Sequence, residues 1–221
     1  AYFGAPQAAR FNVGVDEALT VNLTALTGDG QFLARQALLA WSAVTNINFT
    51  ETAGAAEITF DDNQSGAFAE PVTSGGFITS STVNVGLDWL NSFGTTLNSY
   101  SFETYIHEIG HALGLGHGGN YNGSADYGTD NFYLNDGLAW SIMSYMQADN
   151  DEFDGDGPND WNTFLDASFR YMMTPMIADI IAIQYLYGVS SEFTGDTVWG
   201  FGGTTGVTAI DTAVNQGALM A

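Results

Sequence analysis

The hydrophobic positions in the first part of the chain follow two different periods. Residues 19–26 partly alternate between apolar and polar and are rich in strand-forming types, which predicts a β-strand. Between Phe32 and Val44 the apolar positions recur at helical spacing, and Asp29 or Gly30 is expected to start this helix. Further short strands are expected at residues 47–50, 56–60, 67–72 and 77–87, with turn clusters between them.

The second part of the chain has longer irregular stretches. A helix is predicted from Phe102 to Leu113, followed by a loop rich in Gly, Asn and Asp that extends to Gly137. Thr174 is expected to cap a second helix with Pro175 in its first position, and this helix should stop near Gly188. Short β-like pieces follow. Mixed strands and one helix, then two helices separated by loops, predict an α+β fold.

Composition narrows the range of partners and compartments. The 221 residues include 25 acidic and three basic side chains, giving a formal net charge of −22. Such a charge argues against nucleic acid or an anionic membrane as a partner, because both are polyanions.

No stretch approaches the ~20 apolar residues of a transmembrane helix. The absence of cysteine fits a cytosolic protein, or one exported unfolded without passing an oxidising compartment. The first residues show no signal peptide, so the chain either never had one or is a processed form.

The sequence HEIGHALGLGH, residues 107–117, carries the chemistry. His107 and His111 are four apart on the predicted helix, so both imidazoles project from one face and can bind one metal ion. Glu108 stands beside the first of them. Gly114 can leave the helix with positive φ, which would let the chain turn and bring His117 to the same ion.

Three neutral nitrogens with a fourth position open to water are typical of a catalytic zinc site. In such a site Glu108 takes a proton from the metal-activated water and later passes it to the leaving amine. A chance HExxH or a structural site is the alternative, but the extended motif is far more specific. The chain has three histidines and all lie in this motif, so no other histidine metal site competes.

A second motif, SIMSY at residues 141–145, follows the histidines. The extended histidine motif with a later methionine turn resembles the metzincins. Within that clan the chain is similar to the serralysin family of metalloproteases. This resemblance includes HEIGHALGLGHGGNYNG, SIMSY, IADIIAIQYLYG, LLAWSAVTNINFTE, AEITF and TGDTVWGF, and is strongest over residues 102–188. Absence of cysteine argues against astacins and adamalysins, and lack of further histidines argues against matrix metalloproteases.

The resemblance implies a metzincin-like zinc protease domain: a twisted mixed β-sheet, an active-site helix and a C-terminal subdomain mostly of loops and helix. It implies that Tyr145 is a further zinc ligand in the resting enzyme and hydrogen-bonds the oxyanion during the reaction. Met143 would be an apolar floor beneath the metal. The alternatives are a half-buried aromatic for Tyr145 and ordinary core packing for Met143.

The resemblance also implies calcium. Gly195 and Thr197 match a family calcium site, although the partner carboxylates of that site have no counterpart in this sequence. We expect a catalytic domain over residues 1–190, with subdomains of about 1–117 and 118–190, and in 191–221 the start of a C-terminal β-region that is cut short. The acidic run at residues 149–160 is either a calcium-binding loop or a solvated loop.

The expected function is a secreted, extracellular zinc endopeptidase acting on proteins or peptides. The protein is expected to be a monomer, with a proteinaceous inhibitor as a further candidate partner. Residues 66–71 are interpreted as an edge strand that pairs with substrate, or as a plain connecting strand. The segment 118–140 would wall a substrate pocket. The competing hypotheses are an inactive binding module and a calcium-dependent adhesin.

Overall fold

The computed structural model describes residues 9–14, 17–146 and 170–212 of the chain. Its strands and helices in chain order are β1 (Arg10–Phe11), β2 (Ala18–Ala25), α1 (Gly28–Val44), β3 (Asn48–Glu51), β4 (Ile58–Asp61), β5 (Ala67–Ser74), β6 (Phe77–Val85), α2 (Leu87–Phe93), α3 (Tyr100–Ala112), α5 (Ile177–Tyr187) and α6 (Thr208–Thr212). The predicted α+β class with a mixed sheet is confirmed.

The sheet is parallel except at one edge. Strands β3, β2, β4 and β6 are neighbours in that order and run parallel. β5 pairs antiparallel with the whole of β6, from Ala67 opposite Val85 to Ser74 opposite Phe77. β1 is parallel to the start of β6. A strand was predicted at this position, and the structure shows that β5 is antiparallel and lies at an edge of the sheet.

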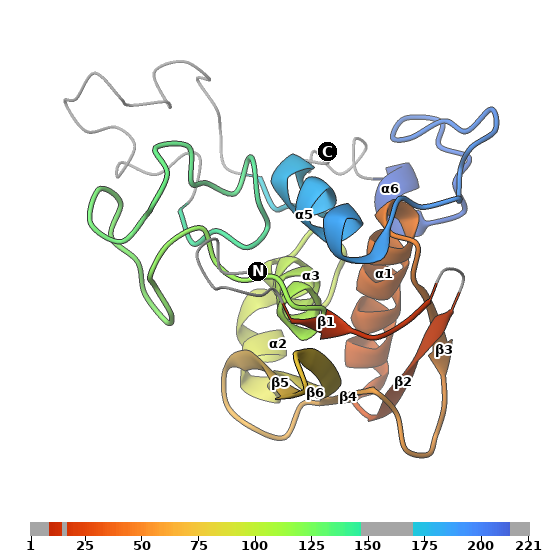
Figure 1. The fold of residues 1–221 in the computed structure, drawn as a ribbon, viewed down its shortest axis with the longest axis horizontal. Helices are drawn as coiled ribbons and strands as arrows, with labels where there is room; N and C mark the ends of the chain where they lie inside the picture. Colours follow the sequence, from red (N-terminus) through yellow and green to blue (C-terminus); the bar gives the residue numbers. More distant parts are fainter. Residues whose placement is uncertain (1–8, 15–16, 147–169, 213–221) are drawn as a thin grey trace.

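Two helices cover one face of this sheet. α1 packs against β2 and β3, whereas α3 packs against β5 and β6, and the two helices lie side by side in Figure 1. Alternate residues of β2 face them, because Leu19, Val21 and Leu23 are buried. Trp41 of α1 is fully buried and its Nε1 donates a hydrogen bond to the Ile106 carbonyl of α3 at 3.0 Å. Helix α3 is thus held between the sheet and α1.

Helix starts differ from the sequence expectation by a few residues, because side chains just outside each helix cap it. The Thr27 hydroxyl accepts from the Gly30 amide at 3.4 Å, so α1 begins at Gly28. The Ser99 hydroxyl accepts from the Phe102 amide at 3.3 Å, so α3 begins earlier than predicted, at Tyr100.

The predicted start of helix α5, with Thr174 as cap and Pro175 in the first position, is wrong. α5 begins at Ile177, and the Asp179 carboxylate accepts from the Met176 amide at 2.8 Å. The hydrogen bond of the Met176 amide at the N-terminus of α5 is thus made by Asp179, a residue inside the first turn, and not by Thr174. The predicted stop at Gly188, which has φ of 89°, is confirmed.

Two further segments were predicted wrongly as strand. Gly86 is the N-cap of the short helix α2, which begins at Leu87. Among the described residues after Gly188, no strand forms; turns lead to α6 instead. Ala209 and Ile210 of α6 are fully buried, and α6 packs on α1. This segment therefore belongs to the same hydrophobic core as α1 and α3.

One hydroxyl ties three parts of the molecule together. The Tyr187 hydroxyl of α5 donates to the Leu113 carbonyl at the end of α3, at 2.7 Å. It also accepts from the Phe11 amide of β1 at 3.0 Å. All three residues are buried, so water cannot replace these hydrogen bonds.

We expect Tyr187→Phe to lower the free energy of unfolding by about 2 kcal/mol, because it leaves a buried amide and a buried carbonyl without this partner. Urea unfolding followed by circular dichroism measures the change. Tyr185→Phe is the matched control, since Tyr185 lies on the same helix and is 88% exposed. Equal stability of the two variants would contradict the bridging role.

Candidate metal centre and active-site cleft

The end of α3 places the three histidines. His107 and His111 project from adjacent turns of the helix, which ends at Ala112. Gly114 has φ of 103°, and a Cβ there would lie 2.1 Å from the Ala9 carbonyl oxygen. Only glycine fits both constraints, and the turn that it makes carries the chain back toward the helix at His117. The predicted positive φ is confirmed.

The histidine Nε2 atoms converge on one point. His117 Nε2 lies 2.9 Å from that of His111 and 3.3 Å from that of His107. One ligand atom from each of the three lies within 4.8 Å of the others. Tetrahedral zinc with Zn–N bonds of 2.0–2.1 Å would hold such nitrogens about 3.3 Å apart. The spacing therefore fits a single small metal ion.

Backbone carbonyls orient all three imidazole rings. The Nδ1 atom of each lies near a carbonyl oxygen: His107 and Ile142 at 2.7 Å, His111 and Leu115 at 2.9 Å, His117 and Tyr121 at 2.7 Å. A carbonyl can only accept, so Nδ1 carries the proton and Nε2 keeps its lone pair. Three lone pairs facing one another repel unless a cation lies between them. This tautomer is the one that a metal ion requires.

Burial keeps these imidazoles neutral. The pKa of His111 falls to about 4, because burial disfavours the charged ring and His117 adds a like charge. Burial also lowers the pKa of His107 and of His117. At neutral pH all three are unprotonated at Nε2, so a metal ion need not displace a proton.

Glu108 is the carboxyl group next to the first of these histidines in the sequence. It is buried, and its Oε2 has no hydrogen-bond partner among the described residues. Burial raises the pKa of Glu108 to about 8. This buried, unpartnered carboxyl lines the same cleft as His107, and a cation bound there would offset the cost of ionising it. The donor set thus fits a divalent metal ion.

The methionine turn approaches α3 closely at Gly110. A Cβ on Gly110 would lie 2.5 Å from the Met143 sulfur and 3.1 Å from Trp41 Cζ2. Met143 is 2% exposed, so it packs under the helix between the turns of His107 and His111. A small residue at position 110 is what permits this approach.

Asp179 of α5 holds the methionine turn in place. Its carboxylate accepts from the Ser141 hydroxyl at 2.6 Å and from the Ile142 amide at 2.7 Å. The carbonyl of the same Ile142 orients the His107 ring. The sequence analysis missed this residue. A single acid in the otherwise uncharged helix IADIIAIQYLY was the signal that could have found it.

Two tyrosines pack around the histidines. The Tyr145 ring centroid lies 4.6 Å from that of His117 and 5.6 Å from that of His107. Tyr121, which the sequence analysis also missed, stacks on His117 at 5.0 Å. Its hydroxyl donates to both oxygens of Asp136, at 2.9 and 3.1 Å. Tyr121 thus contacts His117 twice: its carbonyl oxygen accepts from the imidazole Nδ1, and its ring stacks on the imidazole.

His107, Glu108 and Tyr145 open on a cleft of about 540 Å³. Gly66 and Ala67, at the start of β5, lie on its rim, and residues 123–125 form another part of its wall. The edge strand and the loop predicted to flank the substrate therefore both border the cleft. Its lining among the described residues is Gly66, Ala67, Trp89, Tyr100, Glu103, Thr104, His107, Glu108, Gly123, Ser124, Ala125, Leu138, Ile142, Ser144 and Tyr145.

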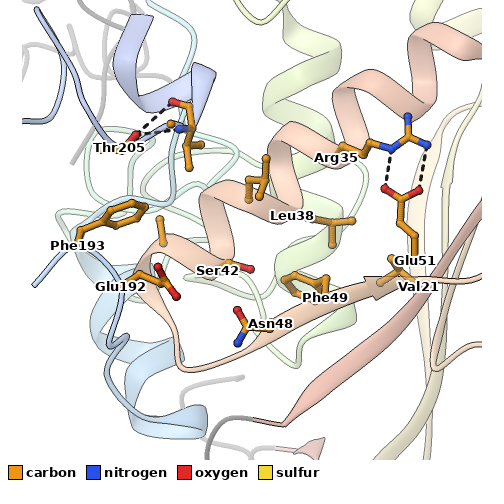
Figure 2. A pocket seen from close by; sticks show the side chains of 14 residues that line it. Val21, Arg35, Leu38, Ser42, Asn48, Phe49, Glu51, Glu192, Phe193 and Thr205 are labelled. Atoms are coloured by element: carbon orange, nitrogen blue, oxygen red, sulfur yellow. Dashed lines mark hydrogen bonds and ion pairs between the residues drawn. The ribbon is translucent and has the colours of Figure 1, made fainter. Parts of the chain in front are cut away.

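A second hollow of about 410 Å³ lies between α1, β3 and residues 192–207, and contains none of the predicted site residues. Figure 2 shows the Arg35 guanidinium paired with both oxygens of Glu51 at one side and Phe193 at the other.

The residues predicted to bind calcium, Gly195 and Thr197, lie in one turn, with the Thr197 amide 2.8 Å from the Gly195 carbonyl oxygen. No second group of three potential metal-binding side chains occurs in the described residues, so the calcium site stays a prediction. The acidic run 149–160 lies outside the described residues.

Comparisons with known proteins agree with this geometry. A family model described as Met-zincin matches residues 103–196, and one described as Peptidase M66 matches residues 62–139. The structure titled myroilysin has a TM-score of 0.50 and 18% identity, covering 83% of this chain and 86% of that one. The fold is that of a metzincin.

Curated relatives refine the class. Metallopeptidase AprA of Pseudomonas marginalis is 34% identical over 219 residues, which cover 91% of this chain and 44% of AprA. Serralysin C of Dickeya chrysanthemi is 36% identical over 188 residues, covering 78% of this chain and 36% of that protein. The resemblance drawn from the motifs is confirmed: most of the chain is similar to metalloproteases of the serralysin type. It spans less than half the length of these relatives.

The buried carboxylate of Asp179 makes the stability depend on pH. Burial raises its pKa to about 6, although its hydrogen bonds oppose the shift. The folded protein binds this proton more tightly than the unfolded chain does. Protonation of Asp179 therefore adds to the free energy of unfolding in full below about pH 4, and this stabilisation is lost as the pH rises through 6. We expect the unfolding free energy of the wild type to fall more steeply over this range than that of Asp179→Asn.

Chemical unfolding at several pH values, with a chelator present in all samples, measures the two slopes. The difference accumulated across the range should be up to about 3 kcal/mol. Asp196→Asn, in an exposed turn, controls for the loss of one negative charge. Parallel curves for the wild type and Asp179→Asn would contradict the expectation.

Proposed function

We propose that this chain is a zinc-dependent endopeptidase that hydrolyses peptide bonds in proteins or peptides. The observation that carries the proposal is the convergence of three unprotonated Nε2 atoms beside the unpartnered Oε2 of Glu108. A cleft bordered by a sheet edge gives an extended chain access to this group. The serralysin resemblance supports the same activity.

His107, His111 and His117 would hold the zinc ion through Nε2. When bound, zinc supplies a Lewis acid that polarises a substrate carbonyl and acidifies water. The remaining tasks fall to side chains and backbone of this chain.

Glu108 is the proton carrier in the proposed reaction. Its position next to His107 on the helix directs it into the cleft, and burial keeps competing water away from it. A carboxyl whose pKa is raised to about 8 can hold a proton between its removal from water and its delivery to the leaving amine.

Tyr145 and β5 would act on the substrate. The Tyr145 ring lies against His107 and His117, so its hydroxyl can serve as a further metal ligand at rest and as a donor to the oxyanion during the reaction. An extended substrate would add by backbone hydrogen bonds to the edge of β5 that pairs with no strand in the described part of the chain. No helix in the described part of the chain is long and apolar enough to span a membrane. Secretion, a monomeric state and structural calcium complete the proposal and rest on the resemblance.

Removal of the proton carrier should separate metal binding from catalysis. We expect the purified wild type to hold about one zinc per chain and to lose casein hydrolysis with a chelator. Glu108→Ala should keep the zinc and lose about 10²- to 10⁴-fold in kcat, because general base catalysis is gone. Zinc content by atomic absorption and peptide hydrolysis measure the two properties. Hydrolysis unchanged in Glu108→Ala, or no zinc in the wild type, would refute the proposal in favour of a binding module.

The Tyr145 hydroxyl should act mainly in the transition state. We expect Tyr145→Phe to retain zinc and to lower kcat about 10- to 100-fold while changing KM little, because the lost hydrogen bond is made to the developing oxyanion. Steady-state kinetics on a fluorogenic peptide measure both constants. Tyr127→Phe, a substitution outside the described cleft lining, is the control. A rise in KM alone would assign Tyr145 to substrate binding.

A further inference from the structure

The cleft contains a second buried carboxylate to which the proposed reaction gives no role. Glu103 lies on α3 one turn before His107 and lines the same cavity as Glu108. It is 4% exposed. Burial of an isolated carboxylate costs free energy, so a carboxylate this deeply buried is expected to have a hydrogen-bond donor or a cation, either from the protein or from a ligand.

The described surroundings satisfy Glu103 only in part. Its Oε2 accepts from the Met172 amide at 2.7 Å. None of the described residues that line the cavity is a lysine or an arginine, so no basic side chain of the lining balances its charge. Burial raises the pKa of Glu103 to about 7, as expected for a carboxyl without a cationic partner.

Aromatic walls flank this carboxylate. Trp89 and Tyr100 both line the cavity, with ring centroids 5.5 Å apart. The Trp89 Nε1 donates to the Thr104 hydroxyl at 3.0 Å, which fixes the indole. Aromatic faces hold the hydrocarbon stem of a long basic side chain and attract its cationic end, whereas a carboxylate pairs with that end. The lining is thus matched to lysine or arginine.

The distance along the helix also fits. Glu103 precedes His107 by four residues, which is a rise of about 6 Å. A substrate residue whose peptide bond lies at the histidine group would need a side chain of roughly that length to reach the carboxylate. Lysine and arginine have this length, whereas acidic residues are shorter and would be repelled.

We propose that Glu103 makes this cavity selective for a lysine or arginine side chain adjoining the scissile bond. The inference rests on the proposed endopeptidase function and names its substrate class. Glu103 is a specificity-determining residue in this scheme and takes no part in bond cleavage.

The first test is the cleavage profile of the zinc-loaded wild-type protein on an unbiased peptide mixture, read by mass spectrometry. Lysine and arginine should be enriched at one of the two positions that flank the cut. Peptides identical except for Lys, Arg, Gln, Leu or Glu at that position then give kcat/KM ratios. We expect the basic peptides to exceed the leucine peptide by about tenfold or more, and the glutamate peptide to be the poorest.

The variant is Glu103→Gln, which keeps the shape and an acceptor for the Met172 amide but removes the charge. The Lys/Leu and Arg/Leu ratios should fall about 10- to 100-fold, the fold-change that corresponds to a lost charge-assisted hydrogen bond. Glu192→Gln, an exposed carboxylate at the second hollow, should leave both ratios unchanged. Zinc content and circular dichroism confirm that each variant is folded.

The outcomes separate this inference from the proposed function. Cleavage without basic enrichment, a preference for Gln over Lys, or equal ratios in Glu103→Gln would overturn the role of Glu103 and leave the endopeptidase proposal intact. Loss of folding in the variant leaves the wild-type profile as the deciding result. No cleavage of any peptide by the zinc-loaded protein would overturn the proposed function, and this inference with it.

Discussion

The structure of the site depends on hydrogen bonds between histidine Nδ1 atoms and backbone carbonyls. Each bond sets a tautomer and a ring orientation together, so three nitrogen lone pairs meet at one point without a proton between them. Two of the carbonyls come from loops, at Leu115 and Tyr121, and one from the methionine turn, at Ile142. The loops must therefore be held almost as firmly as the helix. Gly114, Asp179 and the Tyr187 hydroxyl supply that rigidity from three directions.

Much of the site was readable from the sequence because its donors are close together in the chain. The spacing of His107 and His111 on a helix, followed by a glycine turn, determines where the nitrogens go, and the structure brings His117 to them. The supports were harder to predict. Carbonyl acceptors have no residue signature, and Asp179 acts from a helix far along the chain. Tyr121 was read as part of a loop, although its ring and carbonyl both contact His117.

The fold was predictable where periodicity was strong and was mispredicted where local signals competed. The alternating apolar residues of β2 and the helical spacing in α1 were read correctly, and β4 was predicted as a short strand. Thr174 and Pro175 resemble a helix start, yet Asp179 caps α5 from inside the first turn, with the same carboxylate that accepts from the methionine turn. Gly and Thr after Gly188 suggested strands. Instead Ala209 and Ile210 are buried in a short helix on α1, a tertiary contact that local propensity does not reveal.

Helix α3 combines three roles at successive turns of one rigid element. Glu103 lines the cleft, His107 and Glu108 belong to the proposed metal centre, and the absence of a side chain at Gly110 leaves room for Met143. Because the helix is packed against the sheet on one side and α1 on another, the spacing between these positions cannot change independently. A substrate side chain that reaches Glu103 would therefore set the position of its own peptide bond relative to Glu108. Selectivity and alignment for catalysis would then follow from the same helical rise.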